Sequence, residues 1–115
     1  MSENETGLIT IDDFKRAQLR TARIIEANPH PNADKLMLLK VDVGGEAPKQ
    51  IVAGIRKYYE PEQLVGRTII IVNNLEPAKL RGETSEGMLL AASVGDRIVL
   101  LRPDADEVPG GCEVR

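Results

Sequence analysis

An alternation of apolar and polar residues near the middle of the chain constrains the fold most strongly. Every second position of the segment 37–43 is apolar, whereas Lys40 and Asp42 lie between these positions. Successive side chains of a β-strand point to opposite faces of a sheet, so a period of two predicts a strand with one buried face. A Gly-Gly pair follows the segment and predicts a turn.

Other segments of similar length are rich in β-branched and apolar residues, and Gly or Pro lies in many of the turns between them. They predict further strands over residues 19–27, 50–55, 68–72, 88–92 and 97–101. Thr10 and Asp13 form a capping-box pattern that predicts a short helix over 11–16, with Phe14 packed against the barrel. Pro61 is suited to the first position of a helical turn over 61–64. Short, closely spaced strands predict an all-β barrel or sandwich.

The size of the chain and its few special residues exclude several classes of protein. A length of 115 residues fits one domain, which we place at 10–115 behind a flexible leader at 1–9. The chain has one cysteine, Cys112, and one histidine, His30, too few for a structural zinc site. The N-terminus lacks the basic and apolar regions of a signal peptide, and no apolar run approaches membrane-spanning length. We therefore expect a soluble cytoplasmic protein that contacts no membrane.

The charge is unevenly distributed along the sequence. The net charge is −3, but residues 15–81 carry 12 Lys or Arg against seven Asp or Glu, whereas residues 1–14 and 82–115 are each acidic. An anionic partner responds to the local potential more than to the total charge, so the basic middle is the part suited to nucleic acid. Chance asymmetry in a soluble domain is the alternative at this point.

No catalytic pattern is present. The segment 82–87 contains a serine, but the glycine that a nucleophile elbow needs two residues earlier is absent. His30, the only histidine, lies in a proline-flanked turn with no context for a Ser-His-acid triad. Glycine-rich nucleotide-binding loops are also missing. We expect neither enzymatic activity, nor a metal, nor a cofactor.

Six stretches in order resemble the tRNA-binding domain family. They span about residues 11–110 and are DDF (12–14), LR (19–20), HPNADKL (30–36), IVAGI (51–55), NLEPAKLRG (74–82) and SEGM (85–88). This family includes the C-terminal domain of many bacterial methionyl-tRNA synthetases and stand-alone tRNA-binding proteins. The resemblance implies a five-stranded OB-fold barrel with short flanking extensions, non-catalytic binding of tRNA, and frequently a homodimer.

The resemblance also implies a tRNA-binding surface centred on residues 74–88. Lys79 and Arg81 are one strand repeat apart, which would place both cations on one face for contact with phosphates. Lys35, Arg56 and Lys57 are expected at the rim of this surface, and ordinary solvated cations are the alternative for all five.

Asn74, Ser85 and Met88 are further candidates on the same segment. Asn74 and Ser85 could bind a phosphate, a ribose hydroxyl or an unpaired base edge, although Asn74 could equally stabilise its turn. Met88 is expected to contact a base or sugar, with a place in the core as the alternative. Because only 3% of the residues are aromatic, we expect recognition of RNA shape and backbone rather than extensive base stacking.

The resemblance leaves the partners partly open. A homodimer would form through segments 8–16 and 101–114, and would bring two basic surfaces together. An aminoacyl-tRNA synthetase is a further candidate partner, since the chain could be the beta-chain part of methionine–tRNA ligase, a separate gene product or a trimmed fragment. Two alternatives to tRNA binding are a secretion-chaperone-like protein that binds unfolded peptides and a protein-docking module of a split synthetase.

Overall fold

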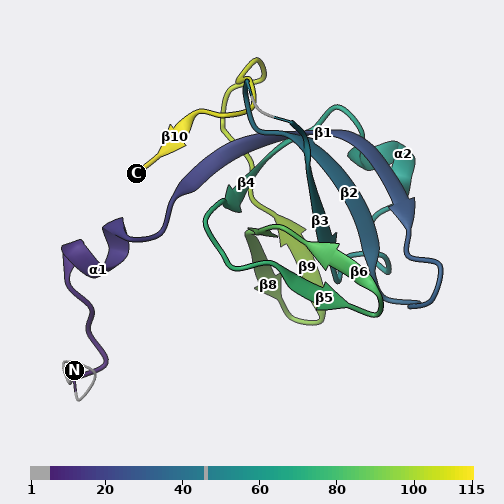
Figure 1. Ribbon diagram of the computed structural model, residues 1–115, viewed down its shortest axis with the longest axis horizontal. Helices are drawn as coiled ribbons and strands as arrows, with labels where there is room; N and C mark the ends of the chain where they lie inside the picture. The colour runs from purple at the N-terminus through teal and green to yellow at the C-terminus, as the bar shows by residue number, and fades with distance from the viewer. Residues whose placement is uncertain (1–5, 46) are drawn as a thin grey trace.

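The computed structural model describes residues 6–45 and 47–115 and contains an antiparallel β-barrel (Figure 1). The expected all-β class and the five-stranded barrel are confirmed, with two short helices. In chain order the elements are α1 (Ile11–Lys15), β1 (Leu19–Pro29), β2 (Met37–Asp42), β3 (Lys49–Ala53), α2 (Pro61–Leu64), β4 (Thr68–Val72), β5 (Ala78–Leu80), β6 (Glu83–Ser85), β7 (Met88–Leu89), β8 (Ala91–Val94), β9 (Arg97–Leu100) and β10 (Glu113–Val114).

One long strand, β1, organises the barrel. Its first half pairs with β4 and its second half with β2, and the register shifts between Ile24 and Glu26. Such an irregularity bends a strand and increases its twist, so that β1 serves both parts of the sheet. The strand order is β3-β2-β1-β4-β7, and β10 pairs with the first residues of β1.

The barrel closes between β3 and the segment that follows β6. The backbone N–H of Glu86 donates to the carbonyl of Gln50 at 2.7 Å, and the N–H of Gln50 donates to the Glu86 carboxylate at 2.9 Å. Closure matters because an unpaired strand edge exposes backbone donors and acceptors. The alternating apolar face of β2 lies inside the barrel, where Met37, Leu39 and Val41 are fully buried among the isoleucines of β1, β3 and β4.

The sequence-based strands agree with the structure except near residue 90. A single strand was expected over 88–92, but the chain leaves β4 after β7 and pairs as β8 with β9 instead. The hairpin β5–β6 and the short strand β10 were not expected at all. None of the helices in the described residues is long and apolar enough to span a membrane.

Helix α1 stands apart from the barrel (Figure 1). The predicted capping box is present, with Thr10 Oγ1 accepting from the Asp13 N–H at 3.0 Å. The expected packing of Phe14 against the barrel is wrong, because α1 buries no residue and Phe14 is 41% exposed. Leu8, Ile9 and Ile11 are also exposed, so the N-terminal arm, defined here as residues 8–14, presents an apolar surface to solvent. Residues 1–5 of the predicted leader lie outside the described residues.

Candidate nucleic-acid interface

The hairpin β5–β6 carries two of the predicted cations, Lys79 within β5 and Arg81 in the loop. Arg81 and Gly82 form its two-residue loop, with φ values of 55° and 91°. Positive φ at both positions is the requirement of a type I′ turn, which matches the twist of the paired strands. Arg81 is the only non-glycine among the described residues with positive φ. Lys79 lies opposite Thr84 in the hairpin and is exposed.

The turn between β1 and β2, residues 30–36, packs on the end of this hairpin through His30. The buried imidazole donates from Nε2 to the Leu80 carbonyl at 3.1 Å, and its Nδ1 accepts the Asn32 N–H at 2.9 Å. A backbone N–H can only donate, so these two bonds require a neutral ring with its proton on Nε2. Arg81 adds a third link by donating to the Asn32 carbonyl at 3.0 Å.

Arg56 holds the same turn from the side of β3. Its guanidinium donates to the carbonyls of Ala33 and His30 at 3.2 and 3.4 Å, and the side chain is half-buried. Lys35 is exposed on the turn, and together with Arg81 it borders a cavity of about 400 Å³. The structure therefore brings Lys35, Arg56 and Arg81 together, and Lys57 is exposed directly after Arg56.

None of these cations forms an ion pair with a carboxylate of the described residues. Within the described ranges the one ion pair joins Arg115 to Glu113 at 3.8 Å, far along the chain. The acidic side chains of this region bind Gln50 rather than the cations. The Glu83 carboxylate accepts from the side-chain amide of Gln50 at 3.2 Å, and the Glu86 carboxylate accepts from the backbone N–H of Gln50. Lysine and arginine side chains without carboxylate partners are available to phosphate groups.

Asn74 lies away from these cations, at the base of the loop that leads from β4 to the hairpin. Its Nδ2 donates to the Arg16 carbonyl and its Oδ1 accepts the Gln18 N–H, both at 2.8 Å. The Asn74 amide thus fastens the segment between α1 and β1 to the barrel. Its side-chain polar atoms are occupied in this arrangement.

Ser85 lies beneath the surface rather than on it. Its side chain is buried, and Oγ accepts from the Val52 N–H at 3.0 Å while donating to the Gly87 carbonyl at 2.8 Å. Met88 is half-buried on β7, opposite Val72 of β4. Ser85 supports the hairpin from within, and the hydrogen bonds of Ser85 and Asn74 do not involve the turn 30–36.

Sequence reasoning missed the parts played by His30 and Gln50. His30 joins the turn to the hairpin, and Gln50 joins β3 to β6 by donating from its amide to the Thr84 carbonyl at 2.9 Å. The position of His30 between two prolines indicated a turn. Its partner Leu80 could not be predicted, because it is 50 residues away in the sequence. No group of three or more His, Cys, Asp or Glu side chains in the described part of the chain could hold a metal.

A family model for the tRNA binding domain matches residues 19–111, which include β1 to β9. The chain belongs to this family. The methionine–tRNA ligase of Thermococcus kodakarensis is 52% identical over 107 residues, a match that covers 93% of this chain but 14% of the ligase. The structure resembles that of a MetRS-related protein from Pyrococcus horikoshii, with a TM-score of 0.87 and 36% identity, and the match covers 94% of this chain and 98% of the other.

A protein described as a chaperone also has a similar structure. The chaperone CsaA from Bacillus anthracis has a TM-score of 0.83 and 31% identity, and the match covers 94% of this chain and 99% of that protein. The chain thus spans a small part of the ligase but nearly the full length of both solved relatives.

Proposed function

We propose that the chain binds tRNA without catalysing a reaction, through the hairpin β5–β6 and the turn 30–36. The observation that carries the proposal is the gathering of Arg81, Lys35 and Arg56 around this junction, in a member of the tRNA-binding domain family. Lys79 and Lys57 extend the positive surface on either side. The cations contact backbone phosphates, and release of counterions supplies a large share of the affinity.

The rigidity of the junction favours recognition of RNA shape. His30, Arg56 and Arg81 fix the turn to the hairpin through hydrogen bonds, so the cations are held in one arrangement before RNA arrives. Preorganised groups lose less conformational entropy on binding. Met88 supplies an apolar contact to a sugar or base at the border of this surface. Asn74 and Ser85 act mainly by holding the loop and hairpin in position, and the protein works in the cytoplasm.

A double variant tests the proposal. Lys79→Ala with Arg81→Ala should weaken binding of all tRNAs to a similar extent, because phosphate contacts carry no sequence information. The salt dependence of the association constant should become shallower by about two units of log–log slope, about one for each lost contact. Gel shifts with total tRNA at a series of salt concentrations measure both quantities.

The matched control removes two arginines elsewhere. Arg97→Ala with Arg115→Ala loses the same charge on exposed residues of β9 and the C-terminus. An equal loss of tRNA affinity in this control would show a non-specific charge effect. Unchanged affinity in the Lys79 and Arg81 variant would show that the RNA binds elsewhere.

We further propose that two copies associate through the N-terminal arm and the C-terminal segment 101–114. Leu8, Ile9 and Ile11 are 64–71% exposed, an apolar surface that a single chain leaves in water. The dimer would present two cationic surfaces to one RNA, and the gain in avidity offsets the small size of each surface.

The likeness to the CsaA chaperone favours a second candidate, binding of unfolded peptides. The exposed apolar arm is the feature that would serve it. An aggregation assay with a chemically unfolded protein separates the two functions: a chaperone suppresses aggregation at stoichiometric ratios, and added tRNA leaves that activity unchanged. Docking to a synthetase is the remaining alternative, and it would show as co-elution with the synthetase in the absence of tRNA.

A further inference from the structure

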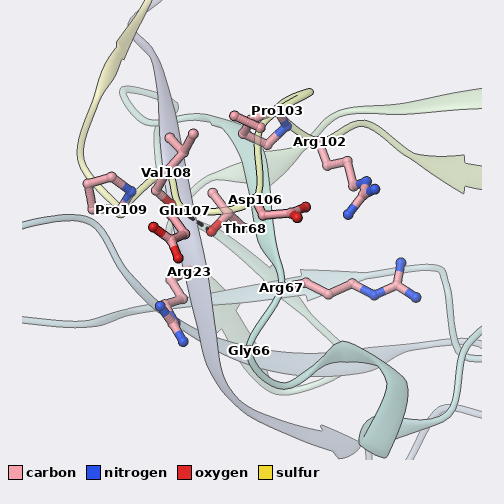
Figure 2. Close-up of a pocket in the computed structure, with 11 residues that line it drawn as sticks. Arg23, Gly66, Arg67, Thr68, Arg102, Pro103, Asp106, Glu107, Val108 and Pro109 are labelled. Carbon is pink, nitrogen blue, oxygen red and sulfur yellow. Dashed lines mark hydrogen bonds between the residues drawn. The ribbon is translucent and has the colours of Figure 1, made fainter.

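A second cationic site borders a cavity of about 590 Å³ on another part of the molecule. The cavity lies between β1, the turn that precedes β4, and the segment 102–109, and three arginines line it: Arg23, Arg67 and Arg102 (Figure 2). In Figure 1 this C-terminal segment crosses the top of the view, whereas the hairpin β5–β6 lies at the lower end. The site is therefore separate from the surface proposed to bind tRNA.

The wall of this cavity is tied to the barrel by two threonines. Thr68 Oγ1 donates to the Val108 carbonyl at 2.9 Å, and Thr21 Oγ1 donates to the Pro109 carbonyl at 2.7 Å. The backbone of Gly111 also donates to the Thr21 carbonyl at 2.7 Å. These bonds hold the segment in place, so the cavity exists before any ligand enters it.

Arg67 is held ready for a ligand. Its Nε donates to the Gln63 carbonyl at 2.7 Å, and its guanidinium carbon lies 5.3 Å from the centre of the Tyr59 ring. These contacts fix the plane of the guanidinium but leave both terminal NH₂ groups without a partner among the described residues. A planar guanidinium with two free donors on one side is the geometry that binds phosphate oxygens in pairs.

The side chains of Arg23 and Arg102 have no hydrogen bond or ion pair with any described residue. In Figure 2 Arg67 and Arg102 extend to the same side of Thr68, and Arg23 lies on the other side. Asp106 and Glu107 also line the cavity, but neither carboxylate is within 4.0 Å of a Lys or Arg nitrogen in the described part of the chain. Three guanidiniums against two carboxylates leave a net positive site in which anion binding would relieve repulsion.

We propose that this cavity binds a nucleotide, with the phosphate on Arg67 and Arg102. Arg23 provides a second positive contact across Thr68. The two carboxylates accept hydrogen bonds from ribose hydroxyls or from a base amino group, which a bare phosphate does not offer. A volume of about 590 Å³ lies in the range of small-ligand sites, which is roughly 300–1,000 Å³. The nucleotide could be free or part of an RNA, and the two sources share this chemistry.

The first experiment maps binding on the protein. Adenosine 5′-monophosphate, added to the ¹⁵N-labelled chain, should shift the backbone amide signals of residues 66–68 and 102–109. Inorganic phosphate at the same concentrations should shift the same signals but bind at least tenfold more weakly. Shifts confined to residues 30–36 and 78–85, or no shifts at all, would overturn the proposal.

Two arginine variants and a control follow. Arg67→Gln with Arg102→Gln should weaken nucleotide binding at least tenfold, and Arg23→Gln with Arg102→Gln, which breaks no hydrogen bond of the protein, should weaken it as well. Arg97→Gln, an exposed arginine on β9 outside the cavity, should leave binding unchanged. Equal nucleotide affinity in the control and in both double variants would contradict the proposal.

A third variant tests the acidic half of the site. Asp106→Asn with Glu107→Gln removes repulsion, so inorganic phosphate should bind more tightly, while the preference for the nucleotide over phosphate should shrink. An unchanged preference would show that the carboxylates do not contact the nucleoside, against the proposal.

The tRNA affinity of the variant Arg67→Gln with Arg102→Gln shows whether the bound nucleotide is free or part of an RNA. A loss of tRNA affinity beyond that of Arg97→Gln with Arg115→Gln, which removes the same charge at exposed residues, indicates a nucleotide within the RNA, and equal affinity indicates a free nucleotide. The variant Lys79→Ala with Arg81→Ala should bind adenosine 5′-monophosphate normally, so failure of this proposal and failure of the tRNA surface are distinguishable.

Discussion

Arg81 has a backbone conformation that arginine rarely adopts. Left-handed backbone costs most L residues about 1–2 kcal/mol, and asparagine and glycine tolerate it better. The turn therefore carries a cation where its geometry favours a small residue. Strained residues of this kind occur often at binding sites, which agrees with the proposed place of Arg81 against RNA.

Replacing Arg81 by asparagine separates the strain from the charge. In Arg81→Asn the relief of strain and the loss of the bond to the Asn32 carbonyl offset each other, so the free energy of unfolding should stay within about 1 kcal/mol of the parent. The tRNA affinity should fall about tenfold, the loss of one charge-assisted hydrogen bond. Urea denaturation and filter binding measure the two effects, and a stable variant with full tRNA affinity would remove Arg81 from the interface.

The hydroxyl of Ser85 stabilises the fold through hydrogen bonds to the backbone of Val52 and Gly87. Ser85→Ala leaves the buried Val52 N–H without an acceptor, so the free energy of unfolding should fall by about 1–3 kcal/mol. Ser93→Ala on β8, which is exposed, should change it by less than about 0.5 kcal/mol. If Ser85→Ala instead kept full stability and lost tRNA affinity, the hydroxyl would contact RNA directly.

The candidate site was only partly predictable from single residues. The cations Lys79, Arg81 and Lys35 could be proposed because they lie in segments that resemble a known family. The burial of Ser85 could not, because its partner Val52 is 33 residues away and only the closed barrel brings them together. The two hydrogen bonds of Asn74 depend equally on distant residues of the segment before β1.

At the scale of elements, the C-terminal segment is as important as the strands. Residues 108–112 cross β1 and β4 at close range, and a Cβ atom on Gly110 would lie 2.1 Å from the Asp42 carbonyl oxygen. Backbone approach of this kind admits only glycine. The segment thus forms one wall of the arginine cavity and leads directly into β10, which pairs with β1.

A glycine substitution tests this close approach. Gly110→Ala should displace the segment and lower the free energy of unfolding by about 1–3 kcal/mol, as overpacking does. Gly54→Ala is the control, since a Cβ there meets no atom within 4 Å. Thermal denaturation gives the stability, and hydrogen exchange at the Gly111 and Cys112 amides should rise only in the first variant. Equal stability of the two variants would show that residues 108–112 can move to admit the added Cβ atom at little cost.

The elements themselves were predictable to the extent that their patterns are local. The strands corresponding to β1–β4 and β9, and both helices, follow from alternation, β-branched residues and capping patterns. Strands β5, β6 and β10 are only two or three residues long, too short to show a pattern, so their pairing comes from tertiary context. The division of 88–92 into β7 and β8 likewise depends on which strand lies beside each residue.

For the whole molecule, the exposed N-terminal arm has the clearest consequence. Light scattering should give the mass of two chains rather than 12.6 kDa. Leu8→Asp with Ile11→Asp should yield the single-chain mass and weaken tRNA binding, because avidity is lost. Val65→Asp, at an exposed apolar site after α2, should remain dimeric. A parent protein that scatters as one chain at micromolar concentration would contradict the dimer.

The bonds that tie Thr21 to Pro109 and Cys112 also set the order in which the domain can be completed. These contacts join residues 88 and 91 positions apart, nearly the two ends of the barrel. A chain still being synthesised cannot form them until residues 109–112 have left the ribosome. Long-range contacts of this kind slow folding, so the newly made protein should pass through a stage in which the barrel is assembled but its arginine cavity is still open.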